Sequence, residues 1–82
     1  MKALYDKEAA KTINRLDAPT KQRIRKAVND IPEGDIKPLK GYTDGRKRLR
    51  IGKFRIIFRE AEKDSEKILF IMEIGSRGDI YK

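Results

Sequence analysis

The sequence contains no cysteine, no histidine and no tryptophan. Without cysteine, the chain can form no disulfide, no Cys-ligated zinc site, no iron–sulfur cluster and no thiol nucleophile. Without histidine, it has no imidazole base and no His-ligated metal, so Ser-His and Cys-His catalysis are excluded. We therefore expect no metal and no cofactor, and any chemistry must come from arginine, lysine, tyrosine, carboxylate, serine or backbone groups.

A long hydrophobic segment is also missing. The longest uninterrupted apolar run is Ile68 to Met72, which is far too short to cross a bilayer. The first six residues lack the apolar core of a secretory signal. We therefore expect a cytoplasmic protein without a membrane segment. A chain of 82 residues supports only one small core, so we expect a single domain over residues 1–82.

Positive charge is abundant and unevenly placed. The chain has 21 lysine and arginine residues against 13 acidic residues, a formal net charge of +8 and a pI near 9.9. Residues 42–59 alone carry seven basic side chains and one acidic side chain. Such a concentration suits a polyanionic partner: nucleic acid, an acidic protein or an anionic surface.

Two apolar stripes with helical spacing predict two short helices after an initial strand over residues 2–5. The first helix starts at Asp6, whose carboxylate can cap the free N–H groups of the first turn. Asp17 and Pro19 mark the start of the second helix, which runs to about residue 31 and is ended by Pro32. The stripe of the first helix comprises Ala9, Ile13 and Leu16, and that of the second comprises Ile24, Ala27, Val28 and Ile31.

After an irregular segment over residues 32–45, alternation of apolar and polar residues predicts strands over 46–51, 54–59 and 67–74. Gly52 and Lys53 suit a type II′ hairpin turn. The polar segment 61–66 predicts the second turn, and Gly75 ends the last strand. The expected fold class is α+β, with the order β-α-α-β-β-β: a small antiparallel sheet with an N-terminal helical hairpin packed on one face.

The Gly52–Lys53 turn determines which hairpin residues lie opposite one another. Arg50 then pairs with Arg55, Arg48 with Ile57, and Arg46 with Arg59. One side of the hairpin is apolar. The other side, which we call the arginine face, comprises Arg46, Arg48, Arg50, Arg55 and Arg59. Like charges directly opposite each other destabilise a sheet, so a bound polyanion is the natural explanation, and arginine suits bidentate phosphate contact. The alternative is a solvated face that prevents aggregation.

The C-terminal segment adds two candidate residues. On a regular strand, residues 69, 71, 73 and 77 share the odd parity of the arginine face, which would bring Arg77 near it with Glu73 as an acidic neighbour. Tyr81 offers a ring for base stacking and a phenol for proton transfer, although a terminal tyrosine can also be a packing residue.

Three motifs follow one another in this short chain. They are Leu39-Lys40-Gly41 before the hairpin, Arg50-Ile51-Gly52-Lys53-Phe54-Arg55 around its turn, and Gly75-Ser76-Arg77 with Tyr81 near the end. Their order and spacing resemble the RelE/ParE superfamily of toxins from type II toxin–antitoxin pairs, and the likeness covers nearly the whole chain. It implies a RelE-like toxin domain, in agreement with the fold expected above.

The basic cluster is similar to the RelE-like branch, whose members are ribosome-dependent endoribonucleases (mRNA interferases) that cut mRNA in the A site and inhibit translation. The resemblance implies catalytic roles for Arg48, Arg55, Arg77 and Tyr81, and nucleic-acid contacts by Arg46, Lys47, Arg50, Lys53 and Arg59. Its implied partners are mRNA, the 70S ribosome and an acidic, partly disordered cognate antitoxin in a hetero-oligomer, with no membrane partner.

The chain departs from the RelE-like pattern in two places. Ser76 stands where many relatives have histidine or lysine, and arginine replaces lysine at positions 46 and 48. Arginine keeps the charge but is a poorer proton donor or acceptor. A DNA gyrase inhibitor of the ParE-like branch and a non-catalytic RNA-binding module are therefore the alternative functions.

Overall fold

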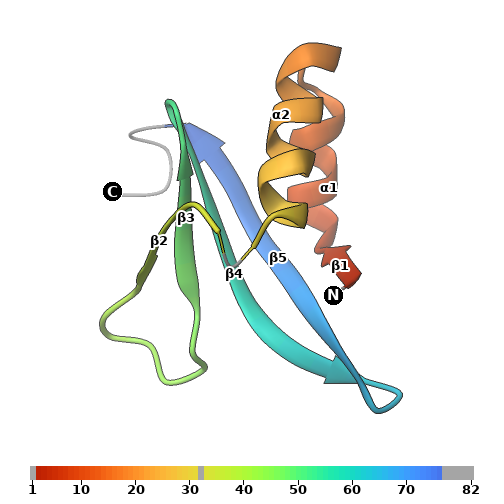
Figure 1. Ribbon diagram of the computed structural model, residues 1–82. Helices are drawn as coiled ribbons and strands as arrows, with labels where there is room; N and C mark the ends of the chain where they lie inside the picture. The colour runs from red at the N-terminus through yellow and green to blue at the C-terminus, as the bar shows by residue number, and fades with distance from the viewer. Residues whose placement is uncertain (1, 32, 77–82) are drawn as a thin grey trace.

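A computed structural model describes residues 2–31 and 33–76, which form two helices and a five-stranded sheet (Figure 1). The elements are β1 (Lys2–Tyr5), α1 (Lys7–Asn14), α2 (Ala18–Asn29), β2 (Asp35–Pro38), β3 (Lys47–Ile51), β4 (Phe54–Lys63) and β5 (Glu66–Ser76). The expected α+β fold is confirmed, with one strand more than the sequence indicated. Neither helix in the described part of the chain is long and apolar enough to span a membrane.

The two helices begin where the sequence predicts, but only one has a side-chain cap. Asp17 accepts hydrogen bonds from the Thr20 backbone N–H at 3.3 Å and the Thr20 hydroxyl at 2.8 Å. These bonds hold the pKa of Asp17 below its usual value. Asp6 occupies the cap position of α1 without a capping side-chain bond. Its backbone N–H instead donates to the Ile71 carbonyl at 2.8 Å, which fastens the start of α1 to β5.

The sheet is mixed rather than antiparallel as predicted, in the order β1-β5-β4-β3-β2. β1 pairs parallel with β5, which the two intervening helices permit, and the other neighbours are antiparallel. β2 corrects the prediction of an irregular segment over 32–45. It is a four-residue edge strand ending at Pro38, too short for alternation to be recognised and placed where proline is tolerated.

The β3–β4 and β4–β5 hairpins are each closed by a two-residue turn. The β3–β4 register is the predicted one, and Gly52 has the positive φ, +55°, that the first turn residue of a type II′ turn requires. The predicted turn over 61–66 was too long. β4 continues to Lys63, β5 starts at Glu66, and the turn consists of Asp64 and Ser65, both at positive φ. The strand ends are charged because they extend beyond the helices into solvent.

A β-bulge between Ile57 and Phe58 changes which residues of β5 share a face. Ile57 pairs with Glu73, whereas Phe58 pairs with Ile71. Because the bulge inserts one extra residue into β5, the predicted parity of 69, 71 and 73 is wrong. Leu69 and Ile71 lie in the core, and only Glu73 lies on the side of the arginine face.

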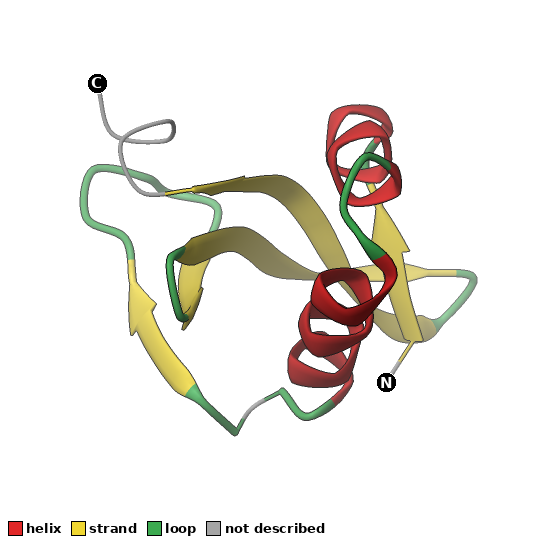
Figure 2. Cartoon of the chain, turned by 90° about the horizontal axis from the view of Figure 1, so that it is seen from above, coloured by secondary structure: helices red, strands yellow, loops and turns green. Residues whose placement is uncertain are grey.

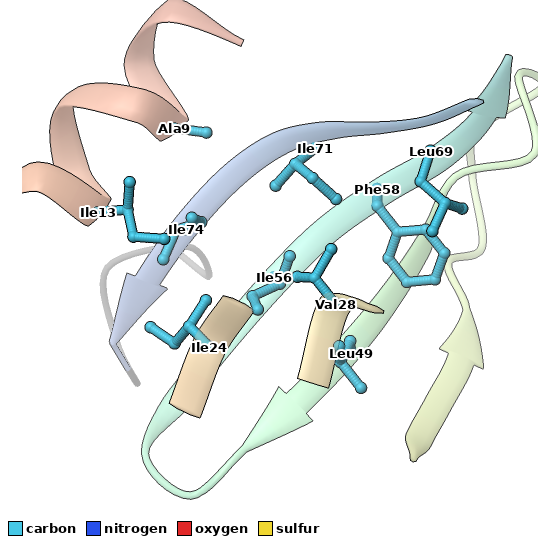
Figure 3. Packing of buried hydrophobic residues seen from close by; sticks show 10 residues of the cluster. All are labelled: Ala9, Ile13, Ile24, Val28, Leu49, Ile56, Phe58, Leu69, Ile71 and Ile74. Carbon is cyan, nitrogen blue, oxygen red and sulfur yellow. The ribbon is translucent and has the colours of Figure 1, made fainter. Parts of the chain in front are cut away.

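The core lies between the helices and one face of the sheet. Figure 3 shows Ile24 and Val28 of α2 pointing toward Ile56 and Leu49, all at most 1% exposed. Ala9 and Ile13 bring α1 into the same cluster, as the predicted stripes required. Seen from above, both helices lie toward the β1 edge of the sheet and away from β2 (Figure 2). Within residues 2–31 and 33–76, no helix covers the opposite face of the sheet, which we call the helix-free face.

Candidate nucleic-acid interface

Four members of the arginine face lie on the helix-free side of the sheet. Arg50 pairs with Arg55, and Arg48 pairs with Ile57. The three arginines alternate along their strands with the core residues Leu49 and Ile56. Arg59, two residues after Ile57, pairs with Phe70 of β5. The predicted register, and with it the clustering of these four side chains, is therefore confirmed.

The middle of this face is apolar. Ile57 is 2% exposed although it points away from the helices, and it lies between Arg48 of β3 and Glu73 of β5. The Arg59 guanidinium lies 5.4 Å from the centre of the Phe70 ring. Arginine stems can cover apolar surface while their head groups stay at the water boundary. The positive charges thus stand around an apolar centre at Ile57.

Arg48 is largely shielded from solvent. Its side chain is 14% exposed, and its Nη2 lies 3.6 Å from Oδ1 of Asp35. Its buried Nε has no hydrogen-bond partner among the described residues. A phosphate oxygen is a strong acceptor for such a guanidinium N–H. The sequence reasoning missed Asp35 and Lys37 on this face. The polar–apolar alternation around Ile36 in β2 was the available signal.

Arg46 lies at the margin of the face rather than in the strand ladder. The β3–β4 ladder ends at Lys47 and Phe58, so the predicted pairing of Arg46 with Arg59 is absent. Arg46 instead binds Asp44, with 2.8 Å between Nη2 and Oδ2 and 3.1 Å between Nε and Oδ1. The hydrogen bond from Arg46 lowers the pKa of Asp44, and the same bond raises the pKa of Arg46.

Glu73 is the acidic neighbour that the sequence predicted. It pairs with Ile57 in the middle of the face, and its negative charge also raises the pKa of Arg46. Arg50 and Arg59, by contrast, form no ion pair within residues 2–31 and 33–76. The face therefore combines two arginines tethered by aspartates with two whose charges are not neutralised by a direct partner.

The remaining predicted site residues lie elsewhere. Lys47 pairs with the core residue Phe58, which places it on the helix-covered side of β3. Lys53 lies in the hairpin turn, with its ammonium 5.5 Å from the centre of the Phe54 ring. Arg77 and Tyr81 lie outside the described residues. The nucleic-acid and catalytic roles of all these residues stay predictions.

The arrangement favours binding of an anion over proton transfer. Arginine stays protonated at all physiological pH values and offers planar pairs of donors to phosphate. The described residues include no group of three or more carboxylates that could hold a metal ion. The interface can therefore position and neutralise phosphate groups.

The chain resembles proteins of a known family. Residues 3–81 match the model of a family described as the ParE toxin of the type II toxin–antitoxin system parDE. The chain belongs to this family. It is thus a type II toxin–antitoxin toxin of the RelE/ParE superfamily, and the resemblance drawn from the three motifs is confirmed. Among curated proteins, no match was found.

Solved structures show the same fold at low sequence identity. The YoeB/ParE toxin from Agrobacterium tumefaciens is 22% identical with a TM-score of 0.76, over 94% of this chain and 99% of that one. A chain of the RelB–RelE antitoxin–toxin complex from Methanococcus jannaschii is 21% identical with a TM-score of 0.71, over 95% and 94%. A chain of the RelBE2 complex from Mycobacterium tuberculosis is 18% identical with a TM-score of 0.71, over 93% and 96%.

Proposed function

We propose that this toxin is a ribosome-dependent endoribonuclease that cuts mRNA in the A site in the cytoplasm. The observation that supports the proposal most directly is the pairing of Arg50 with Arg55 on a sheet face that carries no helix. Like charges in register weaken a sheet, so the arrangement makes physical sense when a polyanion binds there. Single-stranded RNA supplies closely spaced phosphates, and arginine binds them by charge-assisted, bidentate hydrogen bonds.

The proposed reaction is attack of a ribose 2′-oxygen on the adjacent phosphorus. The new O–P bond forms as the bond to the 5′-oxygen breaks, a base removes the 2′ proton, and the leaving oxygen gains a proton. Arg55 and Arg77 bind the scissile phosphate and stabilise its growing negative charge. Arg48, which pairs with Asp35 at 3.6 Å, adds positive charge beside the bound phosphate. Tyr81 stacks on a base or accepts the proton.

Dependence on the ribosome follows from the weak acid–base chemistry of these groups. Arginine stays protonated at physiological pH and seldom exchanges its proton, and an unperturbed tyrosine titrates near pH 10. The rate must then come mainly from charge stabilisation and from an in-line arrangement of the 2′-oxygen and the leaving group. A ribosome that holds the mRNA in a fixed conformation supplies that arrangement.

We further propose that a cognate antitoxin, acidic and partly disordered, forms a hetero-oligomer with this chain. Two of the structurally similar proteins come from antitoxin–toxin complexes. An acidic segment would neutralise the helix-free face and block access of RNA to it. This partner explains how a cell tolerates a chain with a net charge of +8 and an exposed arginine face.

Primer extension on an mRNA, with and without programmed ribosomes, tests the nuclease. We expect cuts at A-site codons only when ribosomes are present. Arg77→Ala and Tyr81→Phe should each reduce cutting by about 100-fold or more, the range typical for a catalytic side chain. Lys63→Ala, which removes an exposed cation at the far end of β4, is the matched control and should cut normally. Normal cutting by both site variants would refute the residue assignment.

Inhibition of DNA gyrase is the second candidate, because the matching family model is named after ParE. A supercoiling assay on the same folded protein distinguishes the two. Loss of supercoiling activity without any mRNA cuts would replace the nuclease with a gyrase inhibitor. RNA binding without cuts and without gyrase inhibition would indicate a non-catalytic RNA-binding module.

A further inference from the structure

The loop between β2 and β3 holds an aromatic ring in a defined position. We call residues 39–46 the tyrosine loop. The Leu39 N–H donates to the Arg46 carbonyl at 3.2 Å and closes the loop at its base. Gly41 and Gly45, at φ values of +87° and +77°, bracket residues 42–44. These positive angles suit glycine and turn the chain sharply on either side of Tyr42.

The guanidinium of Arg46 is fixed against the ring of Tyr42. The two carboxylate oxygens of Asp44 bind it, and the Arg46 backbone N–H also donates to Asp44 Oδ1 at 3.3 Å. The centre of the guanidinium lies 4.1 Å from the centre of the Tyr42 ring. Within this short loop, Asp44 therefore fixes the guanidinium of Arg46, and the guanidinium in turn supports the ring of Tyr42.

Tyr42 is nevertheless 53% exposed, and it is the exposed large hydrophobic residue of the described chain. The Arg46 side chain beneath it is 24% exposed. A ring that is supported by a guanidinium on one side and open to solvent elsewhere is suited to receive a second flat group. Arg46 directly precedes β3, whose Arg48 lies on the helix-free face, so the stack adjoins that face.

We propose that Tyr42 is a nucleobase-stacking residue: a base of single-stranded RNA stacks on its exposed ring while the RNA phosphates lie on the arginine face. This inference rests on the proposed function and adds to it a contact with a base. Arg46 then acts as a positioning residue for Tyr42, not as the direct phosphate ligand that the sequence suggested. An aromatic ring next to a strongly positive surface is the combination by which proteins bind single strands.

A nucleobase fits this stack better than an apolar side chain of a partner protein does. The loop carries Lys40 and Arg46 and adjoins Lys47, so its surroundings attract an anionic chain. Every base has a flat π-surface. A purine, which has two fused rings, overlaps a tyrosine ring over a larger area than a pyrimidine does. We therefore expect a purine at the RNA position that meets Tyr42 to bind best.

Single-stranded RNA oligonucleotides that carry 2-aminopurine at successive positions test the stack without ribosomes. Stacking quenches the fluorescence of this purine, and anisotropy of an end label gives the Kd. We expect the wild-type chain to quench one or two adjacent positions. Tyr42→Ala should abolish that quenching and weaken binding about tenfold, within the range for one stacked base. Tyr42→Phe keeps the ring and should behave like the wild type.

Two further variants separate stacking from charge. Asp44→Asn loosens Arg46 and should weaken the quenching, without lowering the salt dependence of the Kd, because it removes no cation. Arg50→Ala should lower the salt dependence and keep the quenching, because it removes a phosphate contact and not the ring. Circular dichroism spectra of all variants should coincide, since Tyr42, Asp44 and Arg50 are exposed and lie outside the core.

The results for Tyr42 and for the nuclease can be told apart. If Tyr42→Ala quenches and binds like the wild type, the stacking inference is wrong, whether or not the wild-type chain cuts mRNA on ribosomes. If the wild-type chain makes no cuts but Tyr42→Ala loses the quenching, the nuclease proposal fails and the stacking residue stands. If an unlabelled apolar or acidic peptide binds and RNA does not, the loop is a protein-docking site and the inference is overturned.

Discussion

The helix-covered and helix-free faces of the sheet come from the same strands, and their side chains alternate residue by residue. In β4, Ile56 faces the helices and Ile57 faces the arginines, and both are nearly inaccessible to solvent. Side chains of the covered face pack with side chains of both helices in one apolar cluster. The helix-free face sets an isolated apolar centre among arginines, two aspartates and one glutamate.

The difference shows which requirement shaped each face. The covered face follows from burial, because apolar area removed from water stabilises the fold by about 25 cal/mol per Å². The helix-free face does not follow from burial, because it places Arg50 directly opposite Arg55, and like charges in register weaken a sheet. One face thus stabilises the domain, and the other suits the polyanion that we propose binds there.

Ile56→Ala should have the largest effect on stability. Ile56 is fully buried between α2 and the sheet, as Figure 3 shows. Removing its side chain should lower the free energy of unfolding by about 3–5 kcal/mol, through lost transfer energy and the cavity left behind. That is a large part of the total for a small domain. Urea unfolding measures it, and a loss below about 1 kcal/mol would contradict the assigned core.

Ile57→Ala should have a smaller effect although the residue is equally hidden. Its neighbours across the strands are Arg48 and Glu73, whose long side chains can move into the vacated space. We expect a loss of about 1–2 kcal/mol, at or below the lower end for such truncations. Urea unfolding of the two variants side by side gives the comparison. Equal losses would mean that the helix-free face has a rigid core of its own.

The sequence predicted the covered face better than the rest of the molecule, for a physical reason. The stripes of α1 and α2 and the alternation at Leu49 and Ile56 reflect burial, which leaves a periodic trace in the sequence. β2 left only a single polar–apolar alternation around Ile36 because it has four residues, and the bulge at Ile57 and Phe58 shifted the parity of β5 without any local signal. Register predictions held up to the bulge and failed beyond it.

The sequence predicted which arginines lie on the candidate site better than it predicted the contacts that these arginines make. Arg48, Arg50 and Arg55 follow from the hairpin register, which one glycine turn determines. The tether of Arg46 to Asp44 depends on the path of a loop, and the one between Arg48 and Asp35 depends on an unrecognised edge strand. Such contacts arise from tertiary structure and have no period in the sequence.

Arg50→Ala should separate the two faces functionally. Its effect on the free energy of unfolding should stay within about 0.5 kcal/mol, as for other surface substitutions. Its effect on RNA binding should be a weaker Kd and a salt dependence reduced by about one phosphate contact. Titrations at several salt concentrations measure both quantities for RNA. Lys63→Ala makes the same charge change at the hairpin end, and equal effects of the two variants would favour a merely solvated face.

Asp17→Ala should give the smallest effect, confined to the helix layer and dependent on pH. The folded-state pKa of Asp17 lies below the ordinary value of 3.8, chiefly because of its hydrogen bonds with Thr20. The ionised carboxylate therefore stabilises the fold at and above that ordinary value, and this contribution is lost as the pH falls through the folded-state pKa. The variant should melt at a lower temperature than the wild type at pH 7, and the difference in melting temperature should narrow below pH 3.8.

Asp6→Ala is the control for this prediction, because Asp6 occupies the N-cap of α1 without a side-chain hydrogen bond and should change the melting temperature less. RNA binding at pH 7 should be the same for both variants, since neither side chain lies on the arginine face. A change in RNA affinity on loss of Asp17 would show that the helix layer and the helix-free face are coupled, against the separation argued above.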